Sequence, residues 1–469
     1  MSISFILQAG VCRDPEQGID YQYSGGTNLR VGFVELLPRD PAGKTRQRLS
    51  RYLEKSWPID DQLKNENAES LFGWIGRCIA DVVKDGTEEF GLPRSTPIPL
   101  GVAFSFPMEQ RSLSEATLMS MGKGFAISSN LDLGSRLLAG YNQANVEGLP
   151  PIQVAAIAND SVSTLVSFIY KYEDVQQRAS MGLILGTGCN ATIPLKLSQL
   201  HPSKRPANVN VLPGENVENV KIAVNTEWSI NGTAPPLRSL GWVNQWDEIL
   251  DSQNEIPGFQ PLEYMTAGRY LGELGRLVLV DYMTTIAGIP KESLPEALLR
   301  KQSITTTFLS HFKPLDPEAL KAQLEKKFPS STSAASFTWT EELAGVLYHI
   351  AKAIEVRAAG IVAAAIVALL EVGGEIPAGA ASSTSGEAIT GAGERMSREL
   401  GVGYTGGCIV HFQDYLADCQ GFIDELMEQR TVRSGTSAIR VVLNACHDGG
   451  VTGAGILVAA ALASEKADR

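Results

Sequence analysis

Five polar side chains follow or interrupt short apolar segments, at places where they could take part in chemistry. They are Asn159, Asp160, Asn190, Glu227 and Glu263. Carboxylates and amides together offer hydrogen-bond donors and acceptors, which is what the hydroxyl groups of a sugar require. A carboxylate at the end of a strand could also take the proton from an attacking hydroxyl. Taken one by one, each carboxylate is explained at least as well by a helix cap or a surface position.

Four glycine-rich turns could present backbone N–H groups to phosphate. They are Gly25-Gly26-Thr27-Asn28, Gly186-Thr187-Gly188, Gly406-Gly407 and Asp448-Gly449-Gly450. Arg30 adds a positive charge after the first turn, and the fourth turn precedes a predicted helix whose N-terminus could face an anion. Each turn alone is weak evidence, because similar sequences occur in many tight hairpins. Their repeated position at strand ends favours phosphate binding.

Hydrophobic patterning predicts the elements that would position these groups. Short apolar segments predict strands at residues 29–37, 97–106, 154–158, 181–185, 401–410 and 439–443. Helical spacing appears at residues 49–57, 68–83, 161–172, 262–282, 341–370, 412–428 and 453–464. Strands that alternate with helices and end in Gly, Asn or Asp are typical of an α/β architecture with its sites at strand ends. Residues 371–393, rich in Gly, Ala and Ser, are expected to form an exposed, mobile loop remote from the site.

The composition is that of a soluble globular protein. The chain has 469 residues, of which 44% are hydrophobic and 20% charged, and this length suffices for two or three domains. Its net charge is -12 and its pI about 5.1, so neither nucleic acid nor an anionic membrane is an expected partner. The most apolar stretch, residues 358–370, is too short to cross a bilayer. Residues 1–13 lack the preceding basic region of a signal peptide.

The cysteines and histidines predict no metal site. The six cysteines are far apart and form no CxxC pair: Cys12, Cys78, Cys189, Cys408, Cys419 and Cys446. We expect them to be buried, reduced thiols in a reducing compartment, and the five histidines do not cluster. A cytoplasmic location follows as the expectation, with nuclear or mitochondrial-surface association left open.

An ordered series of motifs resembles the hexokinase family over nearly the whole chain, from about residue 24 to residue 464. The matching segments are residues 24–31 (SGGTNLRV), 104–107 (FSFP) with 123–125 (KGF), 159–162 (NDSV), 182–191 (GLILGTGCNA), 225–228 (NTEW), 263–276 (EYMTAGRYLGELGR) and 357–359 (RAA). The family's phosphate, sugar-binding and connecting motifs occur in this order and with similar spacing. So many ordered matches make a chance resemblance implausible.

The resemblance implies a two-lobed α/β fold with the duplicated, ribonuclease H-like core of actin-like proteins and sugar kinases. A hexose and ATP would bind in the cleft between the lobes. The implied N-terminal lobe covers residues 24–173 and the C-terminal lobe residues 174–469, with the last helix, residues 453–464, returning to the N-terminal lobe. Residues 1–23 match the family poorly, and we recognise no first strand among them.

The implied activity is an ATP-dependent hexose 6-phosphotransfer with glucose as the expected hexose and Mg²⁺ as the metal. Asp160 would be the general base, and Lys123 would contact both sugar and transferring phosphoryl. The sugar-binding residues would be Ser105, Phe106, Lys123, Asn159, Asp160, Asn190, Glu227 and Glu263. The nucleotide side would comprise Gly25, Gly26, Thr27, Asn28, Arg30, Gly186, Thr187, Gly188, Arg269, Gly406 and Gly407. No protein metal ligand and no oligomeric state are assigned.

The sequence departs from the family mainly on the nucleotide side. Tyr23 stands where the family has an Asp that helps to hold hydrated magnesium. Thr405 and Gly450 replace the family's Asp and Ser in two later turns, and Met121-Gly122-Lys123 replaces its Trp-Thr-Lys. We therefore expect glucose binding to outlast kinase activity. The alternatives are a catalytically weak or inactive sugar-binding regulatory protein, and a misassembled sequence that has lost its first strand.

Overall fold

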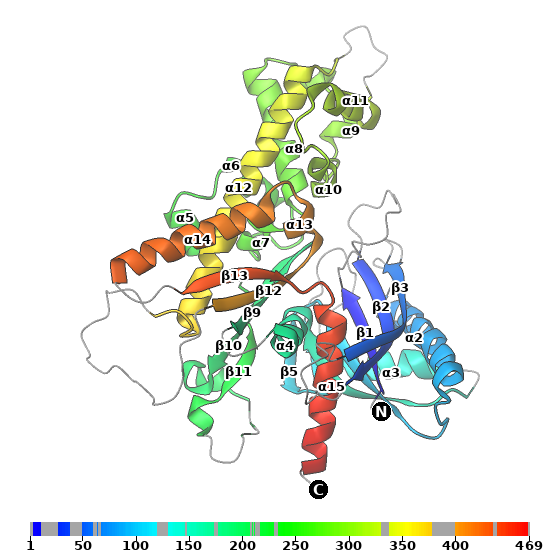
Figure 1. The fold of residues 1–469 in the computed structure, drawn as a ribbon. Helices are drawn as coiled ribbons and strands as arrows, with labels where there is room; N and C mark the ends of the chain where they lie inside the picture. Colours follow the sequence, from blue (N-terminus) through cyan, green and yellow to red (C-terminus); the bar gives the residue numbers. More distant parts are fainter. Residues whose placement is uncertain are drawn as a thin grey trace.

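The structure, a computed structural model, contains two five-stranded sheets and a large helical region (Figure 1). It describes residues 3–10, 27–37, 49–59, 63, 67–119, 130–145, 148–172, 177–206, 209, 211, 216–228, 233–329, 337–377, 399–434 and 439–467. Each sheet has its own hydrophobic core, so the chain is organised in two lobes.

The first sheet has the strand order β3-β2-β1-β4-β8. Its strands are β1 (Ile3–Gly10), β2 (Thr27–Leu36), β3 (Leu49–Ile59), β4 (Ile98–Phe104) and β8 (Ile152–Asn159). Strands β1, β2 and β3 pair antiparallel, whereas β4 is parallel to both β1 and β8. Helices α2 (Ala68–Phe90) and α3 (Leu133–Ala144) and the small sheet of β5 (Met108–Ser112), β6 (Glu115–Leu118) and β7 (Leu131–Asp132) complete this lobe.

The second sheet repeats this arrangement, with the order β11-β10-β9-β12-β13. Its strands are β9 (Gln177–Leu185), β10 (Cys189–Lys196), β11 (Lys221–Asn225), β12 (Glu399–Thr405) and β13 (Arg440–Ala445). The first three again pair antiparallel, and β12 is parallel to β9 and β13. The two sheets therefore share both strand order and strand sense, which confirms the predicted two-lobed α/β fold with a duplicated core.

Two expectations about the N-terminal region are wrong. Ile3–Gly10 forms β1, the central strand of the first sheet, although no strand was recognised within residues 1–23. Residues 49–57, predicted to be helical, belong to the edge strand β3. The apolar residues Leu49, Leu53 and Trp57 are four apart, a spacing that suits a helix. In the strand, a bulge at Leu53 puts Leu49 beside Val34 on one face of the sheet, whereas Leu53 and Trp57 pack in the core on the other. Sheet pairing with β2 selects the strand.

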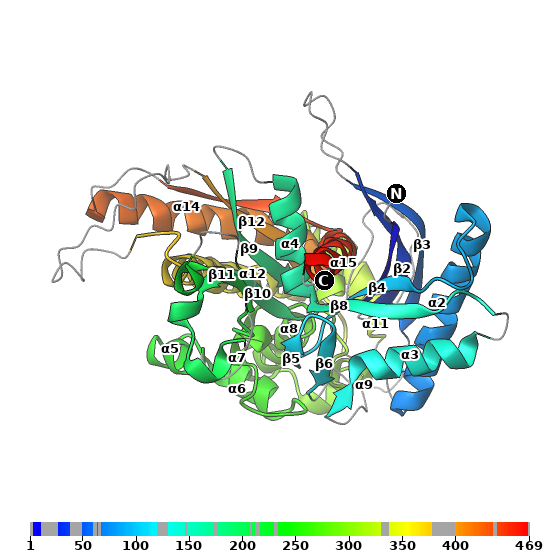
Figure 2. The same cartoon turned by 90° about the horizontal axis from the view of Figure 1, so that it is seen from below.

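Two helices lie side by side between the sheets (Figures 1 and 2): α4 (Asp160–Tyr172) and α15 (Gly449–Ala467). The apolar face of α15 packs on the first sheet, where Val458 contacts Ala155 and Ala156. At the crossing of the helices, a Cβ atom on Gly453 would lie 1.9 Å from the carbonyl oxygen of Ser163. Only glycine permits this approach. Helix α15 begins four residues before the predicted helix, so Gly449 and Gly450 of the fourth glycine turn lie within its first turn and Asp448 precedes it.

The rest of the C-terminal lobe is helical. Its α-helices are α5 (Ala234–Ser239), α6 (Gln245–Ser252), α7 (Pro261–Thr266), α8 (Leu271–Asp281), α9 (Glu296–Leu299), α10 (Thr306–Ser310), α11 (Pro317–Lys327), α12 (Glu341–Val372), α13 (Gly407–His411) and α14 (Tyr415–Ser434). A π-helical turn covers Tyr282–Ile286. Short 3-10 turns occur at Leu197–Gln199, Pro202–Lys204, Val217–Asn219 and Lys291–Ser293.

The long helix predicted at residues 262–282 is broken into α7 and α8. Between them, the backbone N–H of Gly268 donates to the carbonyl oxygen of Gly186 at 2.8 Å, and that of Arg269 to Thr187 at 3.2 Å. These two N–H groups donate to the turn that follows β9 instead of to carbonyl groups of the helix, so the helix is interrupted here. The strand predicted at residues 401–410 likewise stops early, at Thr405, because Gly406 adopts φ +130 and α13 begins.

By length and composition alone, the whole of helix α12 is long and apolar enough to cross a membrane. The expectation that the stretch is too short concerned residues 358–370, which are only part of this helix. In the structure, 56% of its apolar window is buried inside the protein, as in the core helix of a globular lobe. Of the loop predicted at residues 371–393, Glu371 and Val372 end α12 and Ile376 is buried. Residues 378–393 lie outside the described part of the chain. Five cysteines are buried and in no disulfide, as predicted; Cys12 is not among the described residues.

Candidate active site

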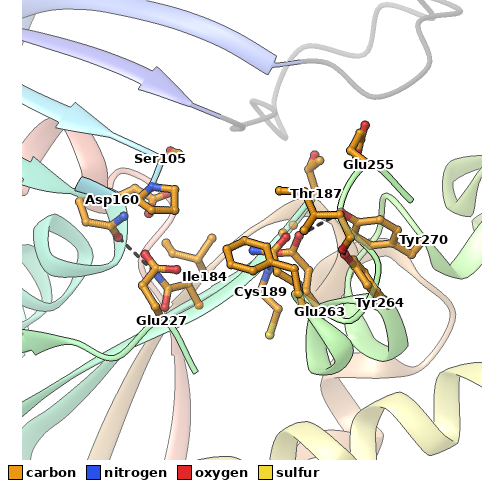
Figure 3. A pocket seen from close by; sticks show the side chains of 18 residues that line it. Ser105, Asp160, Ile184, Thr187, Cys189, Glu227, Glu255, Glu263, Tyr264 and Tyr270 are labelled. Atoms are coloured by element: carbon orange, nitrogen blue, oxygen red, sulfur yellow. Dashed lines mark hydrogen bonds between the residues drawn. The ribbon is translucent and has the colours of Figure 1, made fainter. Parts of the chain in front are cut away.

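A pocket between the two lobes collects most of the predicted polar residues (Figure 3). Its lining includes Ser105, Asn159, Asp160, Gly186, Thr187, Gly188, Asn190, Glu227 and Glu263. It also includes Pro107, Ile184, Cys189, Glu255, Ile256, Phe259, Gln260, Tyr264 and Tyr270, which the sequence did not single out as site residues. Asp160 and Glu227 lie toward one side of the pocket, and Tyr264 and Tyr270 toward the other.

The N-terminal lobe supplies Asn159 and Asp160 at the junction of β8 and α4. Asn159 is the last residue of the strand and Asp160 the first of the helix, and both are at least nine-tenths buried. The positive end of the α4 dipole favours a carboxylate at this position. Ser105 follows the neighbouring parallel strand β4, so the carboxyl ends of two adjacent strands meet at the pocket.

A network of side-chain amides joins the two lobes beneath the pocket. The Oδ1 atom of Asn159 accepts hydrogen bonds from the N–H and the hydroxyl of Ser161, at 2.9 and 2.7 Å. The Nδ2 atom of Asn190 lies 3.4 Å from the same oxygen. The amide oxygen of Asn190 accepts from the N–H of Ala191 at 2.8 Å. These bonds fix which end of each amide faces the pocket.

Glu227 sits on the C-terminal lobe with a left-handed backbone, φ +43, which is unfavourable for a residue other than glycine. Its Oε1 atom accepts from Asn190 Nδ2 at 3.1 Å and from Asn225 Nδ2 at 2.9 Å. Thr226 anchors the same segment to β10, since its N–H and hydroxyl both donate to the Ala191 carbonyl. Strain held by several bonds is common at functional sites.

Glu263, in α7, is buried, and each of its two carboxylate oxygens accepts a hydrogen bond from a protein group. Its Oε2 atom accepts from the backbone N–H of Cys189 at 3.0 Å, and its Oε1 atom from the Tyr270 hydroxyl at 3.2 Å. Burial raises the pKa of the Tyr270 phenol, so this group stays protonated and donates. Each carboxylate oxygen can accept more than one bond, which leaves capacity for a ligand.

The glycine turns after β9 and β12 lie against each other. A Cβ atom on Gly186 would lie 3.4 Å from the Cα atom of Gly406, and one on Gly406 would lie 2.3 Å from the Leu185 backbone. Glycine at position 406 is therefore required by both φ and space. The glycines of these two turns leave room for an anion to approach the backbone next to Thr187, which lines the pocket.

Three predicted site residues are engaged elsewhere. Phe106 is in the core of the first lobe, with its ring 5.2 Å from that of Phe104, and does not line the pocket. The guanidinium of Arg30 is buried and lies 3.8 Å from Glu54 on β3. Strand alternation sends it to the face of β2 that this carboxylate shares.

The guanidinium of Arg269 is also engaged, in an ion pair with Glu255, a residue of the pocket lining. Its Nη2 atom lies 2.8 Å from Oε1 of Glu255, although its backbone N–H binds the Thr187 turn. Asn28 is the second residue of β2, next to the predicted first turn. Other predicted groups lie outside the described residues: Gly25, Gly26, Lys123, Tyr23 and the side chain of Thr27. Their assignments stay predictions.

Several residues with a clear structural role in the site were missed from the sequence. They are Ser161, Thr192, Asn225, Tyr264 and Tyr270. Four of them lie within the motifs recognised at residues 159–162, 225–228 and 263–276, so motif membership was the available signal. The bond of Tyr270 to Glu263 could not be foreseen, because it depends on the break between α7 and α8.

Comparison of the sequence and fold with known proteins shows the protein family to which this site belongs. Family models described as Hexokinase match residues 17–170 and 180–460. Hexokinase-1 of Oryza sativa subsp. japonica is 28% identical over 455 residues, covering 95% of this chain and 80% of the relative. Hexokinase-2 of Solanum tuberosum is 28% identical over 450 residues, with coverage of 95% and 80%.

A solved hexokinase of Schistosoma mansoni, complexed with glucose, has a similar fold, with a TM-score of 0.69 and 23% identity. The similarity covers 97% of this chain and 85% of that one. The duplicated sheets and the polar pocket between them thus define a two-lobed sugar-kinase fold. The chain belongs to the hexokinase family, whose members are ATP-dependent sugar phosphotransferases.

The family implies ATP and Mg²⁺, and the chain fits the first of these on its own geometry. The paired glycine turns at Gly186 and Gly406, with Thr187 beside them, offer backbone and hydroxyl donors to phosphate oxygens. The described residues contain no group of three or more His, Cys, Asp or Glu side chains that could hold a metal. Magnesium in such sites is held through phosphates and one or two carboxylates, so it needs no such group.

Proposed function

We propose that this chain is an ATP-dependent hexose 6-phosphotransferase of hexokinase or glucokinase type, acting on glucose or a related hexose, with a weakened nucleotide side. The observation that carries the proposal is the convergence of Asn159, Asp160, Asn190, Glu227 and Glu263 on one pocket. These residues come from both lobes, and the pocket continues to the Gly186–Gly188 turn. A polyhydroxylated ligand next to a phosphate site is what this arrangement suits.

Asp160 is the group in this pocket suited to act as general base. It stands at the N-terminus of α4, where its carboxyl group faces the positive end of the helix dipole. A carboxylate there can take the proton of the sugar 6-hydroxyl as that oxygen attacks phosphorus. The predicted partner of this step, Lys123, would contact the sugar and the transferring group.

The other polar groups orient the sugar. Glu227 and Glu263 accept hydrogen bonds from sugar hydroxyls, and the amide groups of Asn159 and Asn190 donate or accept. Because these side chains are already held by protein partners, little rotamer freedom is lost when the sugar binds. A fixed acceptor set discriminates between hexoses by the direction of their hydroxyls.

On the nucleotide side, Thr187 and the glycines at positions 186, 188, 406 and 407 are the groups that would hold phosphates. Bound ATP with Mg²⁺ supplies the phosphoryl group and neutralises its charge. Thr405 and Gly450 lack the side chains of intact relatives, and Tyr23 replaces the magnesium-positioning Asp. Loss of one such electrostatic contact commonly lowers the rate by on the order of 10²–10³-fold.

The second candidate function is a catalytically weak or inactive sugar-binding regulatory protein. One observation in its favour is the ion pair between Arg269 and Glu255, because Arg269 is the cation predicted to lie near the nucleotide. The changes at Thr405 and Gly450 favour it as well. This function would keep the sugar pocket and dispense with phosphoryl transfer. Both candidates predict glucose binding, so binding and turnover must be measured separately.

The test is calorimetry of glucose binding beside a coupled assay of glucose-6-phosphate formation. We expect binding to be measurable and turnover to be at least about 10²-fold below that of intact relatives. Glu227→Ala should weaken binding with little change in thermal stability. Turnover of order 10 per second or faster would contradict the weakened nucleotide side. Absence of binding to glucose and other hexoses would contradict the sugar site.

Lobe boundaries and location are part of the proposal. The division falls near residue 173, between α4 and β9, and the first lobe includes β1. A cytoplasmic location is supported by the five buried cysteines that form no disulfide, and a role in glycolysis would follow from phosphorylation of a hexose.

A further inference from the structure

Asn225 lies behind the pocket and does not line it. It is the last residue of β11, two positions before Glu227. Its Nδ2 atom donates to Oε1 of Glu227 at 2.9 Å, and its Oδ1 atom accepts from Nδ2 of Asn190 at 2.8 Å. One amide thus holds two of the polar groups that face the proposed sugar.

The geometry of this triangle leaves each member one orientation. Asn190 donates both to Asn225 and to Glu227, while its own oxygen accepts from the Ala191 N–H. Glu227 Oε1 accepts from both amides. Rotating any one of the three side chains breaks bonds to the other two, so the set is held cooperatively.

Glu227 needs this support because its backbone is strained. With φ +43 it lies in a left-handed region that is unfavourable for a residue with a side chain. Thr226 holds the backbone on β10 through two bonds to the Ala191 carbonyl. Asn225 provides the matching restraint on the carboxylate itself.

We propose that Asn225 is a positioning residue, which aligns Glu227 and Asn190 for the hydroxyl groups of a bound hexose. The proposal rests on the proposed sugar site and deepens it: Asn225 sets hexose affinity without touching the hexose. Its third recorded partner, the Ser161 hydroxyl at 3.5 Å, extends the same arrangement toward α4.

The diagnostic variant is Asn225→Asp, which keeps the size of the side chain and replaces the donor nitrogen by oxygen. Two carboxylates would then face each other, and one of them would bind a proton more tightly than usual. Glu227 is the titratable partner that the structure records for Asn225; Ser161 and Asn190 are uncharged. A shared proton would restore the lost bond, so the defect should fade at low pH.

The experiment measures glucose affinity by calorimetry at pH 8 and pH 5.5, with the melting temperature of each protein. At pH 8 we expect Asn225→Asp and Asn225→Ala to bind glucose at least about tenfold more weakly than wild type, as expected for lost bonds to a charged group. At pH 5.5, Asn225→Asp should recover at least about threefold relative to wild type, and Asn225→Ala should not. A purely structural role would not produce this difference.

Asn444→Asp is the matched control, because Asn444 also lies near the end of a strand of the second sheet, and its amide donates to the Val442 carbonyl at 3.0 Å and does not line the pocket. Its glucose affinity should stay within about twofold of wild type at both pH values. If wild type binds glucose and both Asn225 variants bind it equally well, the positioning role is wrong and the proposed function stands. If wild type binds no hexose, the sugar site and the positioning role are both overturned. If Asn225→Ala fails to fold, Asn225→Asp decides alone.

Discussion

The hydroxyl of Ser161 lies 2.7 Å from the hydroxyl of Thr192, and both side chains are fully buried. Ser161 belongs to the first turn of α4, beside Asp160, and Thr192 to β10, next to the Asn190 segment. This hydrogen bond therefore ties the element that carries the proposed base to the sheet that carries the proposed sugar ligands. The same Ser161 hydroxyl holds the amide of Asn159.

Substitution of these two residues should separate stability from sugar affinity. Thr192→Val should lower the free energy of unfolding by about 1 kcal/mol and leave glucose affinity unchanged. Ser161→Ala should cost about 1–3 kcal/mol and also weaken glucose binding severalfold, because Asn159 loses its restraint. Urea unfolding and calorimetry provide the two readouts. Equal effects of both variants on glucose affinity would show that the Asn159 bond has no role in the site.

Tyr270→Phe should destabilise the protein and weaken sugar binding. Glu263 is 2% exposed, and without the Tyr270 hydroxyl its Oε1 atom loses the donor that the structure records for it. An unmet hydrogen bond at a buried carboxylate costs about 1–3 kcal/mol. The control is Tyr264→Phe, which removes a bond to the Ile256 carbonyl in the same wall of the pocket and leaves Glu263 intact. If both variants lose equal amounts of glucose affinity, Tyr270 has no special part in orienting Glu263.

The stability of the C-terminal lobe should depend on pH through Glu355. This α12 side chain is fully buried, and burial raises the pKa of its carboxyl to about 7, although the ammonium of Lys352 opposes the shift. Its pKa in the unfolded chain is near 4.5. Because the pKa is higher in the folded protein, the contribution of Glu355 to the free energy of unfolding is fully present below pH 4.5 and is lost as the pH rises through 7.

Glu355→Gln removes this dependence, since an amide does not titrate. Between pH 5 and pH 8, the variant should gain on the order of 2–3 kcal/mol of unfolding free energy relative to wild type. Glu342→Gln, an exposed position in the first turn of the same helix, should show no such gain. Urea unfolding at both pH values measures the difference. A constant difference across this range would mean that Glu355 is ionised throughout.

Restoring a carboxylate at position 23 should raise turnover without changing glucose affinity. Tyr23→Asp supplies the group that relatives use to position magnesium, so we expect at least a roughly tenfold gain in the rate of glucose-6-phosphate formation. Tyr23→Asn, which has the size but not the charge, should give little gain. The first sheet contains its central strand β1, so a lack of gain in Tyr23→Asp could not be attributed to loss of that strand. Unchanged turnover in both variants would refute the alignment of Tyr23 with the family's Asp.

The site residues predicted correctly from the sequence are those that belong to short local motifs. Asn159 and Asp160 follow an apolar strand, and Gly186 to Gly188 follow another, so strand-end position alone placed them near a site. The sequence could not show the ion pairs that occupy Arg30 and Arg269, because Glu54 and Glu255 come from other elements. Tertiary contacts also decide the elements that were mispredicted.

Residues 49–57 and 262–282 illustrate this. The spacing of four between the apolar residues of the first segment suits a helix, and only pairing with β2, across a bulge at Leu53, selects the strand. In the second, helical spacing continues through the break, and only the hydrogen bonds of Gly268 and Arg269 to the glycine turn interrupt the helix.

The position of α15 has a consequence for how the protein is made. Part of the first sheet is covered by α15, which follows every strand of both sheets in the sequence; there Val451, Ala454 and Val458 meet Val34, Ala103, Ala155 and Ala156. A growing chain on the ribosome therefore carries this apolar face of the first sheet uncovered until α15 has been synthesised. Chaperones that shield apolar surface have their opportunity during that interval.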